Sequence, residues 1–336
     1  MFESEIYEDC GFVVSTTLTV ELHQFNRCRW KREYSEKNFH RTLHDANLRC
    51  SNTVKKNLNF NGCEVGPLLG SGGFGSVFEA NLKGTKVALK RIHRHRCTNT
   101  SRAFEETVEA EKLILPIRHK NLVRTFAVIE GQGGMDVAII MEFAGYKNLQ
   151  AVIDDESQAM DLTRRVKYAD DIACALNFLH QNNIVHLDLK PANVLLGSDK
   201  TCKLGDFGCC QNLQSLAEND SLLPPSPTKS FLTGTFAYRA PELLKGEIPT
   251  QKADIYSLGI LLWQMLTRDR PYGLESQFVV IFGVVAYDLR PALPPFKTES
   301  SETNYVELIT SLWDGEPSRR PSAARVLEIL HAIRNS

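Results

Sequence analysis

The sequence has no excess of charge of either sign. Its 336 residues include 39 Lys and Arg and 40 Asp and Glu, which gives a formal net charge of -1. A global basic surface that attracts nucleic acid or an anionic membrane is therefore not expected. Hydrophobic residues make up 43% of the chain, which is enough for one large domain or two lobes with their own cores and argues against a disordered chain.

Cysteine pairs and long apolar runs are also missing. None of the nine cysteines belongs to a C-x-x-C pair, so we expect reduced thiols and neither zinc nor a disulfide framework. The longest apolar run, FVVIFGVVAY from Phe278, is about half as long as a membrane span. The first residues, MFESEIYEDC, lack the basic region and apolar core of a secretory signal. We expect a cytoplasmic protein that binds neither nucleic acid nor membrane.

The chain changes character along its length. Residues 1–60 have weak periodicity, and nine basic against four acidic residues lie within 21–60. We predict a poorly ordered, solvated extension there, with docking of a partner as the alternative. Short strand patterns then surround a helical pattern at 102–115, and helical patterns dominate after Gly145. The predicted fold class is therefore α+β, with a small sheet-rich lobe before a larger helical one.

A glycine-rich segment, GSGGFGSV, places Gly70, Gly72, Gly75 and Val77 in the spacing G-x-G-x-x-G-x-V. Three glycines so spaced occur by chance in roughly one chain in ten of this length. A dinucleotide-binding loop would open a helix, whereas the residues that follow here, SVFEA, continue as a strand. A glycine hairpin of this kind can cover nucleotide phosphates with backbone N–H groups, and an ordinary hairpin turn is the alternative.

The next strand pattern contains VALK, residues 87–90. Because side chains two apart in a strand share a face, Ala88 and Lys90 are expected to point together. A small apolar residue beside a lysine suits a cleft with a flat base near Ala88 and phosphates near Lys90. A solvated lysine on an edge strand is the alternative.

A carboxylate is expected to aim Lys90. At about 100° per residue, Glu111 falls on the apolar stripe of the helix at 102–115, whereas Glu109 falls on its polar face. Burying an unpaired carboxylate is costly, so the pattern favours an ion pair between Glu111 and Lys90. Pairing with Glu109 and a structural accident remain the alternatives.

The segment HLDLKPAN contains Asp188, Lys190 and Asn193, and the segment DFG follows with Asp206. A carboxylate can orient an acceptor hydroxyl and take its proton, an ammonium can balance phosphoryl charge, and carboxylate or amide oxygens can bind Mg²⁺. Asp188, Lys190 and Asn193 are therefore candidate catalytic residues, and Asn193 and Asp206 are candidate metal ligands. Each motif alone fits a polar turn, but their order leaves little room for chance.

In this order, the segments GSGGFGSV, VALK, HLDLKPAN, DFG, GTFAYRAPE, ADIYSLG and RRPS resemble the protein kinases over residues 64–333. Lys190 and Thr235 sit in motifs that look like those of the serine/threonine branch. The resemblance implies ATP and Mg²⁺ as cofactors and a bilobal kinase fold. The implied parts are an extension (1–60), an antiparallel-sheet lobe with one main helix (61–141), a hinge (142–146) and a helical lobe (147–336) with an activation segment (206–242).

The resemblance also implies roles for individual residues. Met141 would be the gatekeeper beside adenine, residues 142–144 would hydrogen-bond adenine, and Thr235 would join the catalytic residues by bracing Asp188 and Lys190. The implied nucleotide-binding residues are Leu69, Gly70, Gly72, Gly75, Val77, Ala88, Lys90, Glu111, Met141, Glu142, Ala144 and Asp206.

Two further contacts are implied in the helical lobe. Glu242 would pair with Arg320, and Asp254 would anchor the catalytic loop from a helix at 252–266 that is apolar nearly all round and hence buried.

A narrower resemblance is carried by HLDLKPANVLL, DFGCC, YRAPELLKGE, KADIYSLGILLWQM and VVAYDLRP, which look like the Mos kinases. Members of that family act as MAP kinase kinase kinases in germ cells, where they phosphorylate MAP kinase kinase and support oocyte meiotic maturation. The resemblance implies MAP kinase kinase as the protein substrate, and we expect a monomer. The alternatives are a kinase with a different protein substrate and a kinase-shaped scaffold without turnover.

One position departs from many kinase loops, because Leu187 stands where they carry an arginine that meets a phosphorylated activation-segment residue. Leucine cannot make that contact, so we expect basal activity that needs no phosphate on the activation segment. Ser226, which precedes Pro227 in a long polar loop, is a candidate for feedback phosphorylation by a proline-directed kinase such as MAP kinase. A chance Ser-Pro pair in an exposed loop is the alternative.

Overall fold

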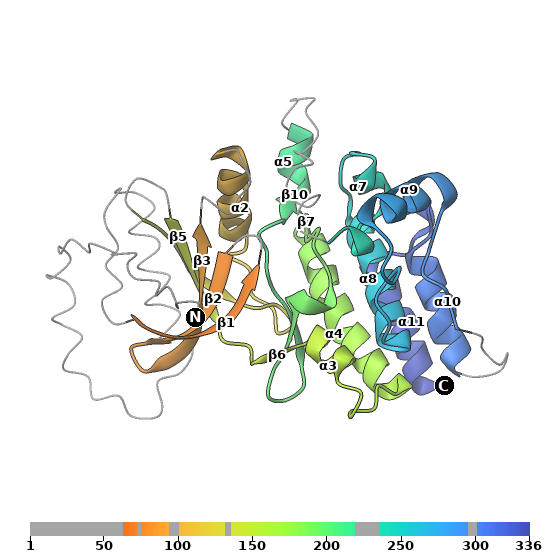
Figure 1. Ribbon diagram of the computed structural model, residues 1–336, viewed down its shortest axis with the longest axis horizontal. Coiled ribbons are helices and arrows are strands. Elements are labelled where there is room, and N and C mark those ends of the chain that lie inside the picture. Colours follow the sequence, from red (N-terminus) through yellow and green to blue (C-terminus); the bar gives the residue numbers. More distant parts are fainter. Residues whose placement is uncertain (1–62, 73–74, 94–100, 132–135, 219–234, 295–300) are drawn as a thin grey trace, which may run out of the picture.

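The computed structural model describes residues 63–72, 75–93, 101–131, 136–218, 235–294 and 301–336. The described chain has two parts that lie side by side, a sheet-rich N-terminal lobe with one main helix and a helical C-terminal lobe (Figure 1). This is the α+β, bilobal arrangement that the sequence predicts. The expected extension over 1–60 and the candidate site at Ser226 lie outside the described residues.

The N-terminal lobe is built on an antiparallel sheet of five strands in the order β1-β2-β3-β5-β4. Val87 and Leu89 of β3 pack on one face of the sheet, and Ile92 packs on the other face against the helix α2. This alternation is the period of two that a strand imposes. The strands are β1 (Cys63–Gly72), β2 (Gly75–Leu82), β3 (Thr85–His93), β4 (Thr125–Glu130) and β5 (Asp136–Glu142).

The helix α2 (Ser101–Leu113) is the predicted helix of this lobe. It ends two residues before the predicted end at 115, because the chain continues as a turn in which the Leu115 N–H donates to the Lys112 carbonyl at 3.1 Å. Pro116 follows, and a proline disfavours helical geometry in the residue before it. Phe104 and Val108 point from α2 into the core of the sheet.

The C-terminal lobe is organised around α8 (Gln251–Thr267), whose residues from Ala253 to Met265 are buried. Gly259 allows this packing, because a Cβ there would lie only 2.9 Å from the Cβ of Leu312 on α10. Side-chain caps from Asp161, Thr250 and Ser276 start helices α4, α8 and α9, as expected for these residue types. The other helices of this lobe are α3 (Leu149–Asp154), α4 (Leu162–Gln181), α5 (Leu213–Glu218), α7 (Pro241–Leu244), α9 (Gln277–Tyr287), α10 (Ser301–Leu312) and α11 (Ala323–Asn335).

Short strands that the sequence pattern did not reveal lie where the two lobes meet. They form the sheets β6-β8-β9 and β10-β7, and with two or three residues each they are too short to show a period. The pairing of β8 with β9 brings the chain after Asn193 beside the chain before Asp206. Their bounds are β6 (Lys147–Asn148), β7 (Ile184–Val185), β8 (Val194–Leu196), β9 (Cys202–Leu204) and β10 (Gln211–Asn212).

Among the described helices, none has both the length and the apolar character that crossing a membrane requires.

Candidate active site

Lys90 lies at the centre of a buried ion triad. Its Nζ is 2.6 Å from Oε1 of Glu111 and 2.6 Å from Oδ1 of Asp206. The side chains of Lys90 and Glu111 are 6% and 1% exposed, whereas that of Asp206 is 35% exposed. Glu109, the alternative in the sequence, is exposed and contacts Lys112 at 2.8 Å. The carboxylate on the apolar face of α2 is therefore the one that meets the lysine.

The charges of this triad set its protonation. Burial by itself would lower the pKa of Lys90, but the neighbouring charges of Asp206 and Glu111 raise it above its usual value. Burial by itself would raise the pKa of Asp206, but the charge and hydrogen bond of Lys90 hold it below its usual value. Burial raises the pKa of Glu111, and the charge of Lys90 only partly offsets this. Lys90 is therefore cationic, and the partly exposed Asp206 is ionised and open to a cation.

The strand register brings the other N-terminal candidates beside Lys90. Val77 lies directly opposite Lys90 in the β2–β3 pair and opposite Gly70 in the β1–β2 pair. Ala88 lies opposite Met141 in the β3–β5 pair. Leu69, next to Gly70, is half-buried within β1. The register therefore gathers the implied nucleotide-binding residues on neighbouring strands.

The glycines of the hairpin differ in the space that surrounds them. A Cβ on Gly75 would lie 1.9 Å from the Arg91 carbonyl oxygen, so the sheet itself requires glycine there. A Cβ on Gly70 or Gly72 would have no atom of the described residues within 4 Å. Space beside these two glycines is thus open, as approach of a phosphate group to the backbone would need.

The catalytic-loop candidates contact one another. Lys190 Nζ lies 2.9 Å from Oδ2 of Asp188. The side-chain amide of Asn193 donates to the same oxygen at 2.9 Å and to the Asp188 carbonyl at 2.8 Å. Asn193 is the last residue of the short helix η4 (Pro191–Asn193), which starts with a proline. The two contacts at Oδ2 restrict the orientation of the Asp188 carboxylate.

Asp254 of α8 anchors the backbone of the candidate catalytic loop. The backbone N–H groups of His186 and Leu187 donate to the two oxygens of Asp254 at 2.9 and 2.8 Å. Leu187 adopts a left-handed φ of 63°, an unusual conformation for a non-glycine residue that tends to occur at functional sites. His180 also contacts Asp254, with its Nε2 at 2.9 Å, and the sequence reasoning did not identify it. His180 lies at the end of a long helical pattern, and nothing in that pattern indicated that its side chain would contact Asp254 of α8.

Asp254 is charged despite complete burial. Burial by itself would raise its pKa, but the hydrogen bond and charge of His180 and the hydrogen bond from His186 hold the pKa below its usual value. An ionised aspartate accepts more strongly from backbone N–H groups than a neutral one. The implied anchoring role of Asp254 thus has a matching set of contacts.

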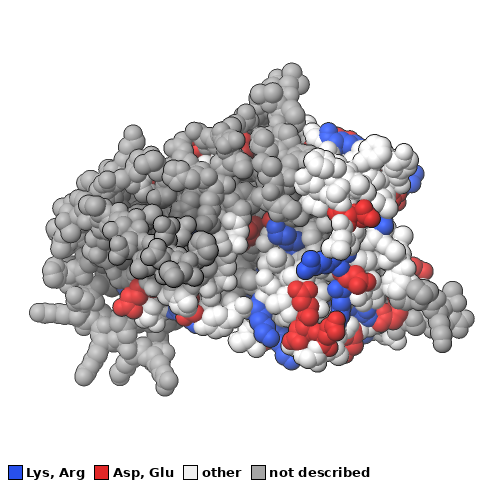
Figure 2. All heavy atoms as spheres, in the orientation of Figure 1, with Lys and Arg blue, Asp and Glu red and all other residues white. Residues whose placement is uncertain are grey.

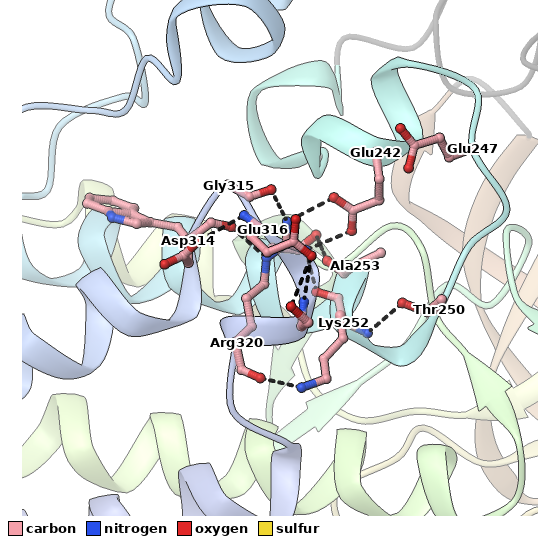
Figure 3. Close-up of polar contacts among 12 residues, drawn as sticks. Glu242, Glu247, Thr250, Lys252, Ala253, Asp314, Gly315, Glu316 and Arg320 are labelled. Atoms are coloured by element: carbon pink, nitrogen blue, oxygen red, sulfur yellow. Dashed lines mark hydrogen bonds and ion pairs between the residues drawn. The ribbon is translucent and has the colours of Figure 1, made fainter.

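The implied pair of Glu242 and Arg320 is present as a bidentate ion pair (Figure 3). Nη1 and Nη2 of Arg320 lie 2.7 and 2.8 Å from the two Glu242 carboxylate oxygens. Arg320 also donates to the carbonyls of Asp314 and Lys252, so the guanidinium joins three segments of the C-terminal lobe. This pair fixes α7, which begins at the end of the implied activation segment (206–242).

The gatekeeper candidate Met141 and the hinge candidates contact both lobes. Met141 packs against the core cluster of α2 and against that of the C-terminal lobe. Glu142 forms an ion pair with Lys203 of β9 at 2.9 Å, a contact that one sequence could not reveal because the two residues are far apart in the chain. Ala144 is buried in the C-terminal core. Thr235 begins the short helix η5 (Thr235–Tyr238), and its side chain lies outside the described structure.

The oxygen atoms near Asp206 suit a Mg²⁺ ion that is bound by both the protein and substrate phosphates. Asp206 and Asn193 offer a carboxylate and an amide, and Mg²⁺ is commonly bound by one or two such protein groups plus substrate phosphates. Within the described residues, no group of three or more His, Cys, Asp or Glu could hold a metal by itself. The residues therefore fit a cation that arrives with a nucleotide.

Comparisons with known proteins show the family to which the chain belongs. The family described as protein kinase domain matches residues 63–331. The chain is 46% identical over 262 residues to the serine/threonine-protein kinase mos of Patiria pectinifera, covering 77% of this chain and 72% of that protein. It is 42% identical over 266 residues to the serine/threonine-protein kinase mos of Xenopus laevis, covering 78% and 73%. It is 41% identical over 282 residues to the proto-oncogene serine/threonine-protein kinase mos of Rattus norvegicus, covering 80% of each.

The fold, the site and the family match define the class, and the chain belongs to the protein kinases. Within that class it belongs to the Mos serine/threonine kinases and is a serine/threonine kinase.

Proposed function

We propose that this kinase transfers the terminal phosphoryl group of ATP to serine or threonine of a MAP kinase kinase. The observation that supports transfer is the contact of Lys90 with both Glu111 and Asp206. The similarity to Mos kinases supports the substrate and a place in the MAP kinase cascade of germ-cell meiosis, as the family resemblance implies. We further propose that the protein acts in the cytoplasm as a monomer.

The acceptor side of the reaction is assigned to the catalytic loop. Asp188 orients the acceptor hydroxyl and takes its proton late in the transfer, because its carboxylate is fixed by Lys190 and Asn193. Lys190 places positive charge where phosphoryl charge develops, which is the main way such sites accelerate transfer. The family resemblance implies that Thr235 braces Asp188 and Lys190 from the activation segment.

The nucleotide side is assigned to the N-terminal lobe and the hinge. Bound ATP supplies the phosphoryl group, and Mg²⁺ offsets its negative charge. Lys90, aimed by Glu111, would hold phosphate oxygens, and Asp206 with Asn193 would hold Mg²⁺. The residues of the hinge would hold the base. Leu69, Gly70, Gly72, Gly75, Val77, Ala88, Met141, Glu142 and Ala144 complete this part of the site.

The test is a transfer assay with purified protein, Mg²⁺ and labelled ATP. A kinase-inactive MAP kinase kinase is offered beside several unrelated inactive kinases at equal concentration. We expect incorporation into serine or threonine of the MAP kinase kinase at least tenfold above the others, and none with an Asp206→Asn variant. Equal incorporation into every acceptor would contradict the proposed substrate while leaving the kinase activity intact.

A further inference from the structure

Lys86 of β3 lies at the centre of a group of contacts beside the hinge. Its Nζ donates to the Tyr146 hydroxyl and lies 2.9 Å from Oε1 of Glu79. The Tyr146 hydroxyl donates in turn to Oε2 of Glu79 at 2.8 Å. The same Lys86 ammonium lies 4.3 Å from the ring centroid of Phe143 and 4.5 Å from that of Tyr146. These four residues, Glu79, Lys86, Phe143 and Tyr146, are called the hinge cluster below.

The hinge cluster joins the two lobes. Glu79 and Lys86 belong to β2 and β3 of the N-terminal sheet. Tyr146 is tied to the C-terminal lobe on both sides, because a Cβ on the preceding Gly145 would lie 2.3 Å from the carbonyl oxygen of Leu196. The two residues that follow it form β6, which pairs with β8 and lies between the N-terminal sheet and the helices (Figure 1). The contacts of Tyr146 with Glu79 and Lys86 therefore span the lobes.

The strand register places the hinge cluster next to the candidate nucleotide-binding residues. Glu79 lies directly opposite Ala88 in the β2–β3 pair, and side chains directly opposite each other share a face of the sheet. Lys86 precedes Ala88 by two residues in β3, so its side chain is on that face as well. Lys90, two residues further along, is the third. The N-terminal half of the hinge cluster thus lies on the face of the sheet that carries Ala88 and Lys90.

The hinge cluster is more than an ordinary surface ion pair. Over the C-terminal lobe, Figure 2 shows Lys and Arg atoms next to Asp and Glu atoms, and an isolated exposed pair of this kind contributes little. In the hinge cluster, hydrogen bonds from Lys86 and Tyr146 hold the pKa of Glu79 below its usual value. Hydrogen bonds with Tyr146 and Glu79 raise the pKa of Lys86. Both groups are therefore charged at neutral pH, and a motion that separates the lobes would break the ionic, hydroxyl and ring contacts together.

We propose that Tyr146 is a positioning residue that, through its contacts with Glu79 and Lys86, keeps the two lobes together on the bound nucleotide and slows nucleotide release. The inference rests on the proposed function, since it takes the residues around Lys90 to bind ATP. Closure matters to this site because Lys90 of one lobe contacts Asp206 of the other. In many enzymes the opening of such a closed state sets the rate at which a ligand leaves.

The test measures how fast a fluorescent ATP analogue leaves the full chain in the presence of Mg²⁺, by stopped-flow displacement with excess ATP. Tyr146→Ala is expected to release the analogue at least about threefold faster and to raise KM for ATP by a similar factor. Its kcat should not fall, because the groups assigned to the phosphates stay in place. Tyr146→Phe keeps the ring beside Lys86 but loses both hydroxyl hydrogen bonds, so its release rate should lie between those of wild type and Tyr146→Ala. Tyr146 is 70% exposed, so its replacement should not impair folding, and the matched control is Tyr287→Ala, at a tyrosine of α9 that is 74% exposed.

A double-variant comparison tests whether the contact itself is responsible. Lys86→Ala removes the same contacts from the other lobe, so the double variant Lys86→Ala, Tyr146→Ala should release the analogue no faster than the faster single variant. A release rate that multiplies the two single effects would overturn the inference, because the two residues would then act independently. Release from Tyr146→Ala that matches wild type, or an equal change in Tyr287→Ala, would also overturn it while leaving the proposed function intact. A wild type that does not bind the analogue would overturn the proposed function and this inference with it.

Discussion

Lys90 and Asp206 are 116 positions apart in the chain, yet the Nζ of one lies 2.6 Å from Oδ1 of the other. The contact joins the strand β3 of the N-terminal lobe to the segment that follows β9 in the C-terminal lobe. Glu111 holds the same ammonium from α2. Three separate elements must therefore be in place before this group of charges exists.

The first prediction concerns Glu111. Glu111→Gln keeps the shape of the side chain but removes the charge that holds Lys90, so we expect kcat/KM to fall at least about tenfold, or about 1.4 kcal/mol. The matched control is Glu109→Gln, which changes an exposed glutamate two residues earlier and should stay within twofold of wild type. Steady-state transfer assays measure both, and equal behaviour of the two variants would contradict the assigned role.

The second prediction concerns the acceptor side. Asp188→Asn removes the proposed proton acceptor while it preserves the size of the side chain, so we expect kcat to fall about 10²–10⁴-fold. Nucleotide affinity, measured by titration of a fluorescent ATP analogue, should change less than twofold. Asp199→Asn, in the exposed turn between β8 and β9, is the control. A kcat of Asp188→Asn close to that of wild type would contradict the proposed role of Asp188 as proton acceptor.

The third prediction concerns stability. Glu242→Gln leaves the guanidinium of the fully buried Arg320 without its counter-charge, which should lower the free energy of unfolding by about 3–5 kcal/mol. Arg325→Ala breaks an exposed ion pair with Glu328 and should cost less than about 1 kcal/mol. Denaturant unfolding of both variants gives the comparison. A loss for Glu242→Gln as small as that of the surface variant would mean that the pair contributes little.

The fourth prediction is a pH dependence. The pKa of Asp254 lies below its ordinary value of 3.8 in the folded protein, so its contribution to stability is present above that value. This contribution is lost as pH falls through the folded pKa. In urea unfolding between pH 7 and pH 3, Asp254→Asn should be less stable at neutral pH and should lose less stability below about pH 4 than wild type. Asp269→Asn, an exposed position after α8, should follow the wild-type curve.

The fifth prediction follows from Leu187. A leucine in the catalytic loop has no charge with which to meet a phosphate, so phosphatase-treated protein should keep its kcat within twofold. Mass spectrometry confirms removal of phosphate from the treated sample. The prediction would be contradicted if treatment abolished activity and phosphorylation at a single activation-segment site restored it. A cationic side chain other than residue 187 would then have to bind that phosphate.

The sequence could predict those features that depend on residues close together in the chain. The period of two in β3 put Ala88 and Lys90 on one face, and the helical period separated Glu111 from Glu109. The contacts of Asp254 with His180 and of Glu142 with Lys203 were not predictable from period, because each joins residues on different elements.

The sequence alone determined the fold class, the order of the motifs and the residue types that can handle phosphate, since strand and helix periods and turn chemistry act over a few neighbouring residues. Only the tertiary structure decided which charges meet and how far they are buried. It also decided that α9 turns two phenylalanines outward although its sequence is apolar all round. Burial and charge pairing depend on distances between elements remote in the chain, and those distances are fixed only when the lobes pack.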